Sequence, residues 1–220
     1  MIEVEIRDDV RILHWNDGDN RFNGPSIARW HEVLDDLEQI EGPLGIVVVG
    51  TGKFFSNGLD LEWFGEHPDE VGAVLDGVHR LFGRLLTFPA YTVAAINGHA
   101  FAGGAMLTCA CDARIMRADR GFWCIPEVDL GHPLTEAMHA VIEVRLPRPV
   151  QFDAVLTGRR YSGTNAEHHG IVDDCLHESE VLHRSVERAQ EIAVKDRSVI
   201  AAHKQHLFGA AAAVCGWPAG

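Results

Sequence analysis

Two glycine-marked loops of this chain could present free backbone N–H groups to a ligand. Gly58 lies within the segment 53–61, and Gly103-Gly104 ends the segment 96–104, immediately before an apolar run. N–H groups in the first turn of a helix lack intrahelical partners and attract negative charge. Two such donors aimed at one oxygen would form an oxyanion hole. Each loop by itself is more simply explained as a tight turn.

Both loops follow segments that predict buried β-strands. Residues 44–49 and 91–96 are apolar runs rich in β-branched residues, as expected for strands covered on both faces of a parallel sheet. Ligands of open α/β sheets bind beyond the carboxyl ends of the strands. The two loops are therefore expected at a ligand-binding edge.

The remaining pattern predicts a mixed α/β fold. Residues 2–7 and 10–15 alternate in hydropathy and predict a β-hairpin. Consecutive strand–helix units between 44 and 116 indicate right-handed crossovers and a parallel sheet. The other predicted elements are helices at 27–40, 71–85, 105–111, 133–144, 149–156, 164–169, 178–195 and 197–213, and strands at 113–116 and 171–175. We divide the chain into a core, 1–155, that carries the site and a helical C-terminal region, 156–220.

Composition excludes several classes of function. A net charge of -13 over 220 residues argues against nucleic acid, which requires a basic face. No apolar run approaches the roughly 20 residues that cross a bilayer. The five cysteines include no Cys-x-x-Cys pair, and the thirteen histidines form no set with metal-ligand spacing. We therefore predict a cytoplasmic protein with reduced thiols, no metal and no membrane or nucleic-acid partner.

Six motifs follow one another between residues 54 and 173. They are Phe-Phe-Ser-Asn-Gly-Leu-Asp-Leu at 54–61, Ala-Ala-Ile-Asn-Gly-His-Ala-Phe-Ala-Gly-Gly-Ala at 94–105, Cys-Asp-Ala-Arg at 111–114, Pro-Glu-Val-Asp-Leu-Gly at 126–131, Leu-Thr-Gly-Arg-Arg-Tyr-Ser at 156–162 and His-Gly-Ile-Val-Asp at 169–173. In this order they resemble the crotonase superfamily, also called the enoyl-CoA hydratase/isomerase family.

The resemblance implies a crotonase-like spiral of ββα units with a helical C-terminal region, assembled as a homotrimer or dimer of trimers. It implies an acyl-CoA thioester as substrate, with coenzyme A entering as part of that substrate and no separate cofactor. The oxyanion N–H groups map to Leu59 and Gly103. The residues expected to contact coenzyme A are Arg21, Phe22, Ser56, Gly58, Asp60, Leu61 and Gly104.

The carboxylates distinguish the members of this family. Hydratases carry two glutamates that hold a water, and the first of their positions is Met106 here, whereas the second is Glu127. One carboxylate suffices for a 1,3-proton shift. The resemblance is therefore greatest to the monofunctional Δ3,Δ2-enoyl-CoA isomerases of fatty acid oxidation, with Glu127 as the base. Met106 and Trp63 are expected to line the acyl pocket.

Three alternatives remain open. A hydratase could draw its second carboxylate from Asp60, Glu62, Asp129 or Glu136. A dienoyl-CoA isomerase would have aspartates where Met106 and Thr135 stand. A non-catalytic acyl-CoA-binding protein would need no Glu127. Lys53, and more weakly His203, Lys204 and His206, are further candidates for contacts with coenzyme A.

Overall fold

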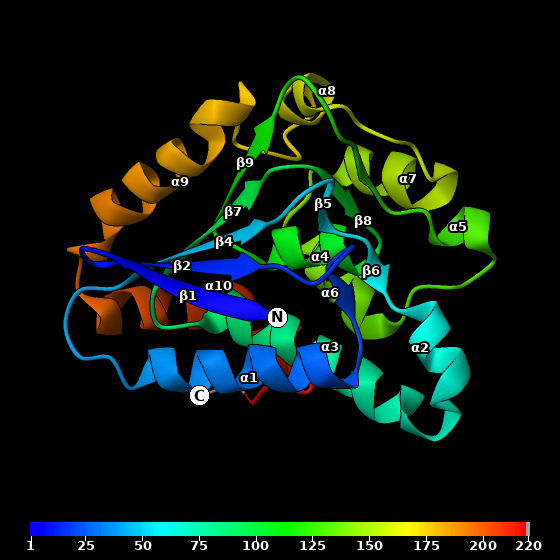
Figure 1. The fold of residues 1–220 in the computed structure, drawn as a ribbon, viewed down its shortest axis with the longest axis horizontal. Helices are drawn as coiled ribbons and strands as arrows, with labels where there is room; N and C mark the ends of the chain where they lie inside the picture. The colour runs from blue at the N-terminus through cyan, green and yellow to red at the C-terminus, as the bar shows by residue number, and fades with distance from the viewer. Residues whose placement is uncertain (219–220) are drawn as a thin grey trace.

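A six-stranded β-sheet forms the centre of the computed structural model, which describes residues 1–218 (Figure 1). Its strands, in spatial order, are β1 (Ile2–Arg7), β2 (Val10–Trp15), β4 (Gly45–Gly50), β7 (Tyr91–Ile96), β9 (Ala113–Arg117) and β11 (Asp174–Leu176). β1 and β2 pair antiparallel, and every pair from β2 onward is parallel. The predicted hairpin and parallel sheet are therefore confirmed.

Two small parallel sheets hold the glycine-marked loops. β5 (Phe54–Ser56), β8 (His99–Phe101) and β10 (Trp123–Cys124) pair in the order β10-β8-β5. β3 (Arg21–Phe22) pairs with β6 (Gly58–Leu59). Because β5 and β8 follow β4 and β7 along the chain, these small sheets continue from the carboxyl ends of the central strands.

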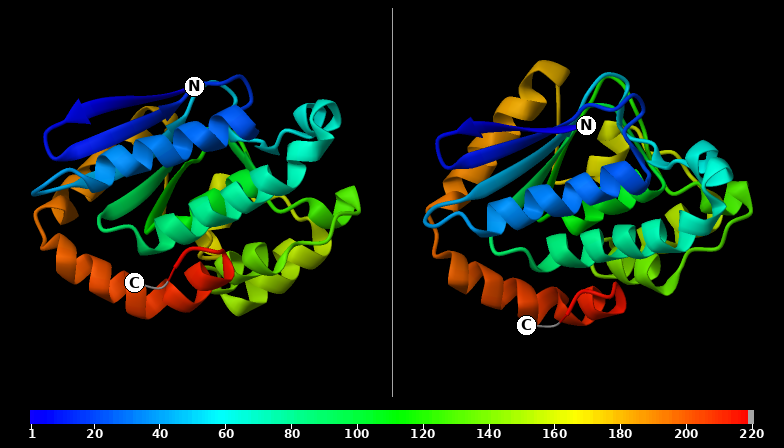
Figure 2. Two further views of the ribbon diagram at one scale, coloured as in Figure 1. Left: turned by 90° about the horizontal axis from the view of Figure 1, so that it is seen from below. Right: turned by 60° about the horizontal axis from the view of Figure 1, so that its bottom comes forward.

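Helices cover both faces of the central sheet. The helical elements of residues 1–218 are α1 (Gly24–Glu38), α2 (Leu61–Glu66), the 3₁₀ turn η1 (Pro68–Glu70), α3 (Val71–Thr87), α4 (Gly103–Ala110), α5 (Glu127–Leu130), α6 (Glu136–Glu143), α7 (Arg148–Thr157), α8 (Gly163–His168), α9 (Glu178–Ala193) and α10 (Arg197–Val214). α9 packs on β2, β4, β7 and β9. α1 and α3 lie side by side beneath the other face, and α10 packs along α3 (Figure 2). Within residues 1–218, no helix has the length and apolarity to cross a bilayer.

The apolar run of β4 serves two cores at once. Ile46 and Val48 join the main core between the sheet and α1 and α3, whereas Val47 and Val49 join a smaller core beneath α9. Successive side chains of a strand point to opposite faces. A strand that is buried on both faces therefore has a continuous apolar sequence, which is the pattern that predicts β4.

Short elements and element ends differ from the prediction. The strand predicted at 171–175 is Asp174–Leu176, and the helix predicted at 133–144 begins at Glu136 because Thr135 caps it by accepting a hydrogen bond from Met138 N–H. α2 and α5 were not predicted, since four to six residues are too few to show a helical period. The division near residue 155 stays a prediction.

Candidate active site

The two glycine-marked loops meet at Gly58 and Gly103. Gly58 has a φ of +78°, and a Cβ built on it would lie 2.8 Å from Ala102 Cβ and 3.1 Å from Gly103 N. A Cβ on Gly103 would in turn lie 3.7 Å from Gly58 Cα. Only glycine permits this approach of the two backbones. The structure therefore brings the two predicted oxyanion donors into neighbouring positions.

The pairing of β6 sets the direction of the Leu59 N–H group. Asp60 N–H donates to the Phe22 carbonyl at 2.9 Å, in a parallel ladder that pairs Phe22 with Leu59. Consecutive N–H groups of a strand point to opposite edges. Leu59 N–H therefore faces away from β3 and is not used by this ladder.

Gly103 N–H belongs to the open first turn of α4. The first intrahelical hydrogen bond runs from Met106 N–H to the Ala102 carbonyl at 3.1 Å. The N–H groups of Gly103, Gly104 and Ala105 come before it and have no partner within the helix. Ala102 adopts a φ of +51°, which costs about 1–3 kcal/mol in a residue other than glycine. Its N–H donates to the Cys124 carbonyl at 3.0 Å. β10 thus holds the turn that aims Gly103 N–H.

Ser56 and Asn20 fix the loop that carries Gly58. Ser56 is fully buried; its hydroxyl donates to the Asn20 carbonyl at 2.7 Å and accepts from Gly58 N–H at 3.3 Å. The Asn20 side chain donates to the carbonyls of Phe54 and Phe55 at 3.1 and 3.2 Å. A Cβ on Gly104 would lie 2.5 Å from the Ser56 carbonyl oxygen. Ser56 therefore fixes the loop that carries Gly58, and glycine at position 104 permits the close approach of α4 to Ser56.

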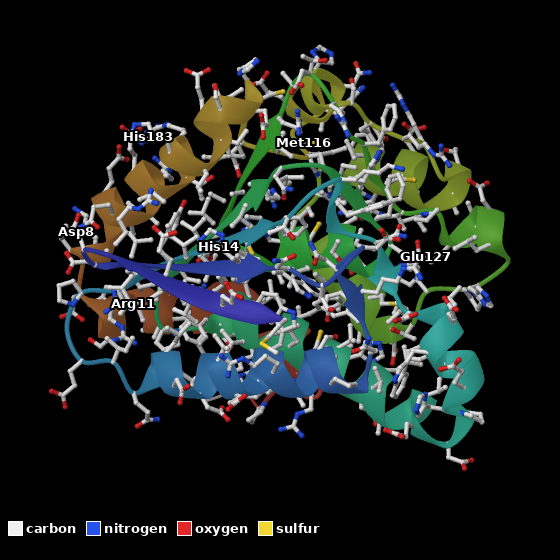
Figure 3. The ribbon with its side chains drawn as sticks, in the orientation of Figure 1. Asp8, Arg11, His14, Met116, Glu127 and His183 are labelled. Atoms are coloured by element: carbon white, nitrogen blue, oxygen red, sulfur yellow. The ribbon has the colours of Figure 1, made fainter. Side chains whose placement is uncertain are left out.

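Glu127 is a partly buried carboxylate at the first position of α5. Among residues 1–218, it is the one carboxylate with a buried oxygen, Oε2, that has no hydrogen-bond partner. Desolvation by burial raises the pKa of Glu127 to about 7. Figure 3 shows Glu127 at the opposite end of the molecule from Asp8 of the β1–β2 turn, on the side toward which β2 and β4 run. A carboxyl group in this state can exchange a proton near neutral pH.

The predicted contacts on β3 are largely engaged with protein groups. Arg21 donates to Asp19 at 2.8 Å and lies 3.8 Å from an Asp60 oxygen. Asp60 also caps α2 by accepting from Trp63 N–H at 3.2 Å. Phe22 is buried, and its ring lies 3.3 Å from the position of a Cβ on Gly103. The Phe22 ring therefore packs against the turn that carries Gly103.

A cavity of about 390 Å³ opens between these elements. Arg21 and Leu61, predicted as coenzyme A contacts, and Leu59, predicted as an oxyanion donor, line it. Phe101, Ala102 and Arg160 were not predicted as site residues, although the first two lie in the motif at 94–105 and Arg160 lies in the motif at 156–162. The full lining is Arg21, Asn57, Leu59, Leu61, Phe101, Ala102, Cys124, Pro126, Leu130 and Arg160.

The residues predicted as acyl-pocket walls lie elsewhere. Met106 is fully buried in α4, and Trp63 is half-buried, stacked on His67 with ring centroids 4.2 Å apart. Neither lines the 390 Å³ cavity, and their role in an acyl pocket stays a prediction.

Lys204 is buried and donates to Asp112 at 2.7 Å, so the expectation that it contacts coenzyme A was wrong. Residues 1–218 contain no cluster suited to a metal ion.

The family described as enoyl-CoA hydratase/isomerase matches residues 16–213 of this chain. The chain belongs to the enoyl-CoA hydratase/isomerase family. It is 31% identical to the peroxisomal enoyl-CoA delta isomerase 2 of Arabidopsis thaliana, covering 94% of this chain and 92% of that protein. It is 33% identical to the carnitinyl-CoA dehydratase of Salmonella typhi, covering 82% of this chain and 69% of that one.

The fold of the family is also shown by solved structures. The human mitochondrial delta3-delta2-enoyl-CoA isomerase has a TM-score of 0.89 and 24% identity, covering 96% of this chain and 84% of that one. The predicted crotonase-like fold is therefore confirmed. The relatives include both isomerases and a dehydratase, so family membership by itself does not select one reaction.

Gly58→Ala is expected to lower kcat by about 10²-fold, the scale of losing one oxyanion donor. A methyl group there would collide with Ala102 and the Gly103 backbone and push the loops apart. Gly52→Ala is the matched control, because Gly52 has a similar φ of +70° but open space around its Cβ position. Steady-state kinetics measures the activity of both variants. An equal loss in the two would show that the contact between the two loops is not the cause.

Glu127→Gln is expected to raise the free energy of unfolding of this protein above neutral pH. Because the folded-state pKa of Glu127 is about 7 against an ordinary 4.5, the wild type loses stability as pH rises from about 4.5 to 7. Glutamine does not ionise and avoids that loss, which we estimate at about 1–3 kcal/mol. Urea unfolding at pH 5 and pH 8 measures it; an equal difference at both pH values would exclude the effect.

Proposed function

We propose that this enzyme is a Δ3,Δ2-enoyl-CoA isomerase, which moves a double bond from C3 to C2 of an acyl-CoA thioester. The observation that carries the proposal is Glu127, the one carboxylate of residues 1–218 with a buried oxygen that lacks a hydrogen-bond partner, in a fold whose two glycine-marked loops converge. Met106 occupies the position in α4 where the resemblance places the first hydratase glutamate, and it is fully buried. A thioether neither accepts a proton at neutral pH nor orients a water as a carboxylate does.

The proposed reaction needs one base and two N–H donors. The thioester carbonyl accepts hydrogen bonds from Leu59 N–H and Gly103 N–H. Glu127 removes a proton from C2, and the C–H electron pair forms a C1–C2 double bond as negative charge moves to the carbonyl oxygen. The protonated Glu127 then returns the proton to C4. The electrons shift to leave a C2–C3 double bond and restore the carbonyl, so atoms and charge balance.

The state of Glu127 suits both halves of this reaction. A pKa of about 7 leaves an appreciable fraction of the carboxylate ionised at neutral pH. The same value makes the carboxylic acid that follows a competent donor, because catalytic efficiency is highest when the pKa lies near the working pH. An exposed glutamate with an ordinary pKa would be a weaker base, and its protonated form would lose the proton more readily at neutral pH.

Hydration of a 2-enoyl thioester is the second candidate, favoured by the similarity to a carnitinyl-CoA dehydratase. Water addition would need a second group to hold the water opposite Glu127. After Asp129, the next carboxylate along the chain is Glu136 at the start of α6, and it is exposed. A non-catalytic binding protein would not require Glu127 to keep a buried, unpartnered oxygen.

The test offers purified protein a 3-enoyl-CoA and a 2-enoyl-CoA in parallel. Conversion of the 3-enoyl substrate to the 2-trans product, without loss of the double bond, is the expected result. Predominant formation of a 3-hydroxy product from the 2-enoyl substrate would replace the isomerase by a hydratase. Binding of both thioesters with turnover of neither would support the non-catalytic alternative.

The setting of the enzyme is proposed on the family resemblance. We propose that it acts in oxidation of unsaturated fatty acids, in the cytoplasm, as a homotrimer or dimer of trimers, with no cofactor beyond the coenzyme A of its substrate. Light scattering on the purified protein distinguishes these assemblies from a monomer.

A further inference from the structure

β10 is a two-residue strand that connects the two parts of the proposed catalytic machinery. On one edge it pairs with β8, and there the Cys124 carbonyl accepts from Ala102 N–H at 3.0 Å, in the turn before Gly103. Three residues after Cys124 comes Glu127, the proposed base. Any shift of β10 would therefore change the position of the Gly103 N–H group relative to the Glu127 carboxylate.

The other edge of β10 is held by the segment 158–161, here called the clamp segment. Tyr161 exchanges both backbone hydrogen bonds with Trp123 at 2.9 Å, in an antiparallel bridge of a single residue pair. The Cys124 thiol donates to the Gly158 carbonyl at 3.2 Å. These contacts fix β10 only if the clamp segment is itself held in place.

The Tyr161 hydroxyl attaches the clamp segment to α7. It donates to Asp153 Oδ2 at 2.6 Å, and the tyrosine is fully buried, with its ring edge-on to Trp123. Asp153 also accepts from Arg159 at 2.9 Å, but that bond is exposed. A hydrogen bond to a carboxylate is about twice as strong as a neutral one, whereas an exposed ion pair contributes little. The hydroxyl bond is therefore the main link between the clamp segment and α7.

α7 also packs against α5, the helix that begins at Glu127. Gly158 caps α7 with a φ of +62°, and a Cβ built on it would lie 2.6 Å from Asp129 Oδ2 in α5. Burial raises the pKa of Cys124 to about 11, and the neighbouring Glu127 carboxylate adds to that rise. The clamp segment, β10 and the Glu127 side chain therefore belong to one packed unit.

We propose that the hydrogen bond from the Tyr161 hydroxyl to Asp153 positions Glu127 by fixing β10. Tyr161 does not line the 390 Å³ cavity, so it is a positioning residue that acts through the strand. The assignment rests on the proposed isomerase reaction, in which one carboxylate must reach both C2 and C4 of the substrate. A displacement of about 1 Å at a reacting group can cost roughly 10²-fold in rate. A hydrogen bond remote from the substrate can therefore control kcat.

The test begins with Tyr161→Phe, which removes the hydroxyl and keeps the buried ring. We expect kcat for a 3-enoyl-CoA to fall about tenfold, with KM changed by less than about twofold. The midpoint of the pH profile of kcat/KM should move below 7, because Glu127 gains access to water. Asp153→Ala should match Tyr161→Phe with no further loss in the double variant, whereas Asp153→Asn keeps an acceptor oxygen and should retain most of the activity. Arg159→Gln is the matched control, because it removes only the exposed partner of Asp153.

A lower melting temperature in Tyr161→Phe, with kcat and the pH midpoint both unchanged, would overturn the assignment, because the bond would then stabilise the fold alone. Carbon-13 NMR of labelled glutamate gives a readout that does not depend on turnover, with the Glu127 signal assigned by its loss in Glu127→Gln. A lower pKa of Glu127 in Tyr161→Phe, in a protein that does not isomerise a 3-enoyl-CoA, would support the positioning role and refute only the proposed reaction. An unchanged pKa in an active enzyme whose kcat is also unchanged would refute the positioning role alone.

Discussion

Glu127→Gln is expected to lower kcat for isomerisation of a 3-enoyl-CoA by about 10²–10⁴-fold, the usual contribution of a positioned general base. Glutamine keeps the size of the side chain but can neither take the proton from C2 nor return one to C4. The two glycine-marked loops, which we propose hold the thioester carbonyl, are untouched, so KM for the thioester should change little. Single-turnover measurement of double-bond movement gives the chemical step directly.

The pH dependence of the wild type provides an independent check on the same residue. Because only ionised Glu127 can act as the base, kcat/KM should fall about tenfold per pH unit below a midpoint near pH 7, where burial places the pKa of Glu127. Glu136→Gln is the matched control, since Glu136 is exposed at the start of α6. A loss in Glu136→Gln as large as in Glu127→Gln would indicate two-carboxylate chemistry and favour hydration.

Lys204→Met is expected to lower the free energy of unfolding by about 3–5 kcal/mol, as for breaking a buried ion pair from one side. Lys204 reaches from α10 into the protein, is 5% exposed, and donates to Asp112 at 2.7 Å and to the Ala90 carbonyl at 3.3 Å. Asp112 also accepts from the N–H and hydroxyl of Thr92 at 2.8 and 3.0 Å. Removing the lysine leaves this carboxylate without its cation.

Equilibrium unfolding in urea measures the change, provided the slope with denaturant stays constant. Adding Asp112→Asn to Lys204→Met should recover part of the loss, because the uncompensated charge is removed. Lys195→Met is the matched control: Lys195 is exposed at the junction of α9 and α10 and should contribute no more than about 0.5 kcal/mol. A loss below about 1 kcal/mol in Lys204→Met would show that this pair does not hold α10 to the sheet.

Lys204 also illustrates where prediction from local pattern fails. From the sequence, His203, Lys204 and His206 of the last helix are equal candidates for contacts with coenzyme A. α10 is rich in alanine, so its apolar positions do not indicate clearly which side faces the protein. Which of these side chains is buried depends on the packing of α10 against α3 and α6. That packing joins residues distant in sequence, and no local period encodes it.

The sequence by itself determined the parallel sheet and the two glycine-marked loops. It also determined that Glu127 is the one carboxylate at the two motif positions where hydratases carry glutamates. These follow from local causes: apolar runs suited to strands buried on both faces, glycines at tight turns, and residue types at motif positions. Tertiary structure alone decided that Gly58 touches Gly103 and that β10 holds the strained turn at Ala102. It also decided that the aspartates Asp19 and Asp60 engage Arg21 at the edge of the cavity. Such charges and contacts depend on strand register and helix packing between distant segments, which bring together groups that the linear pattern keeps apart.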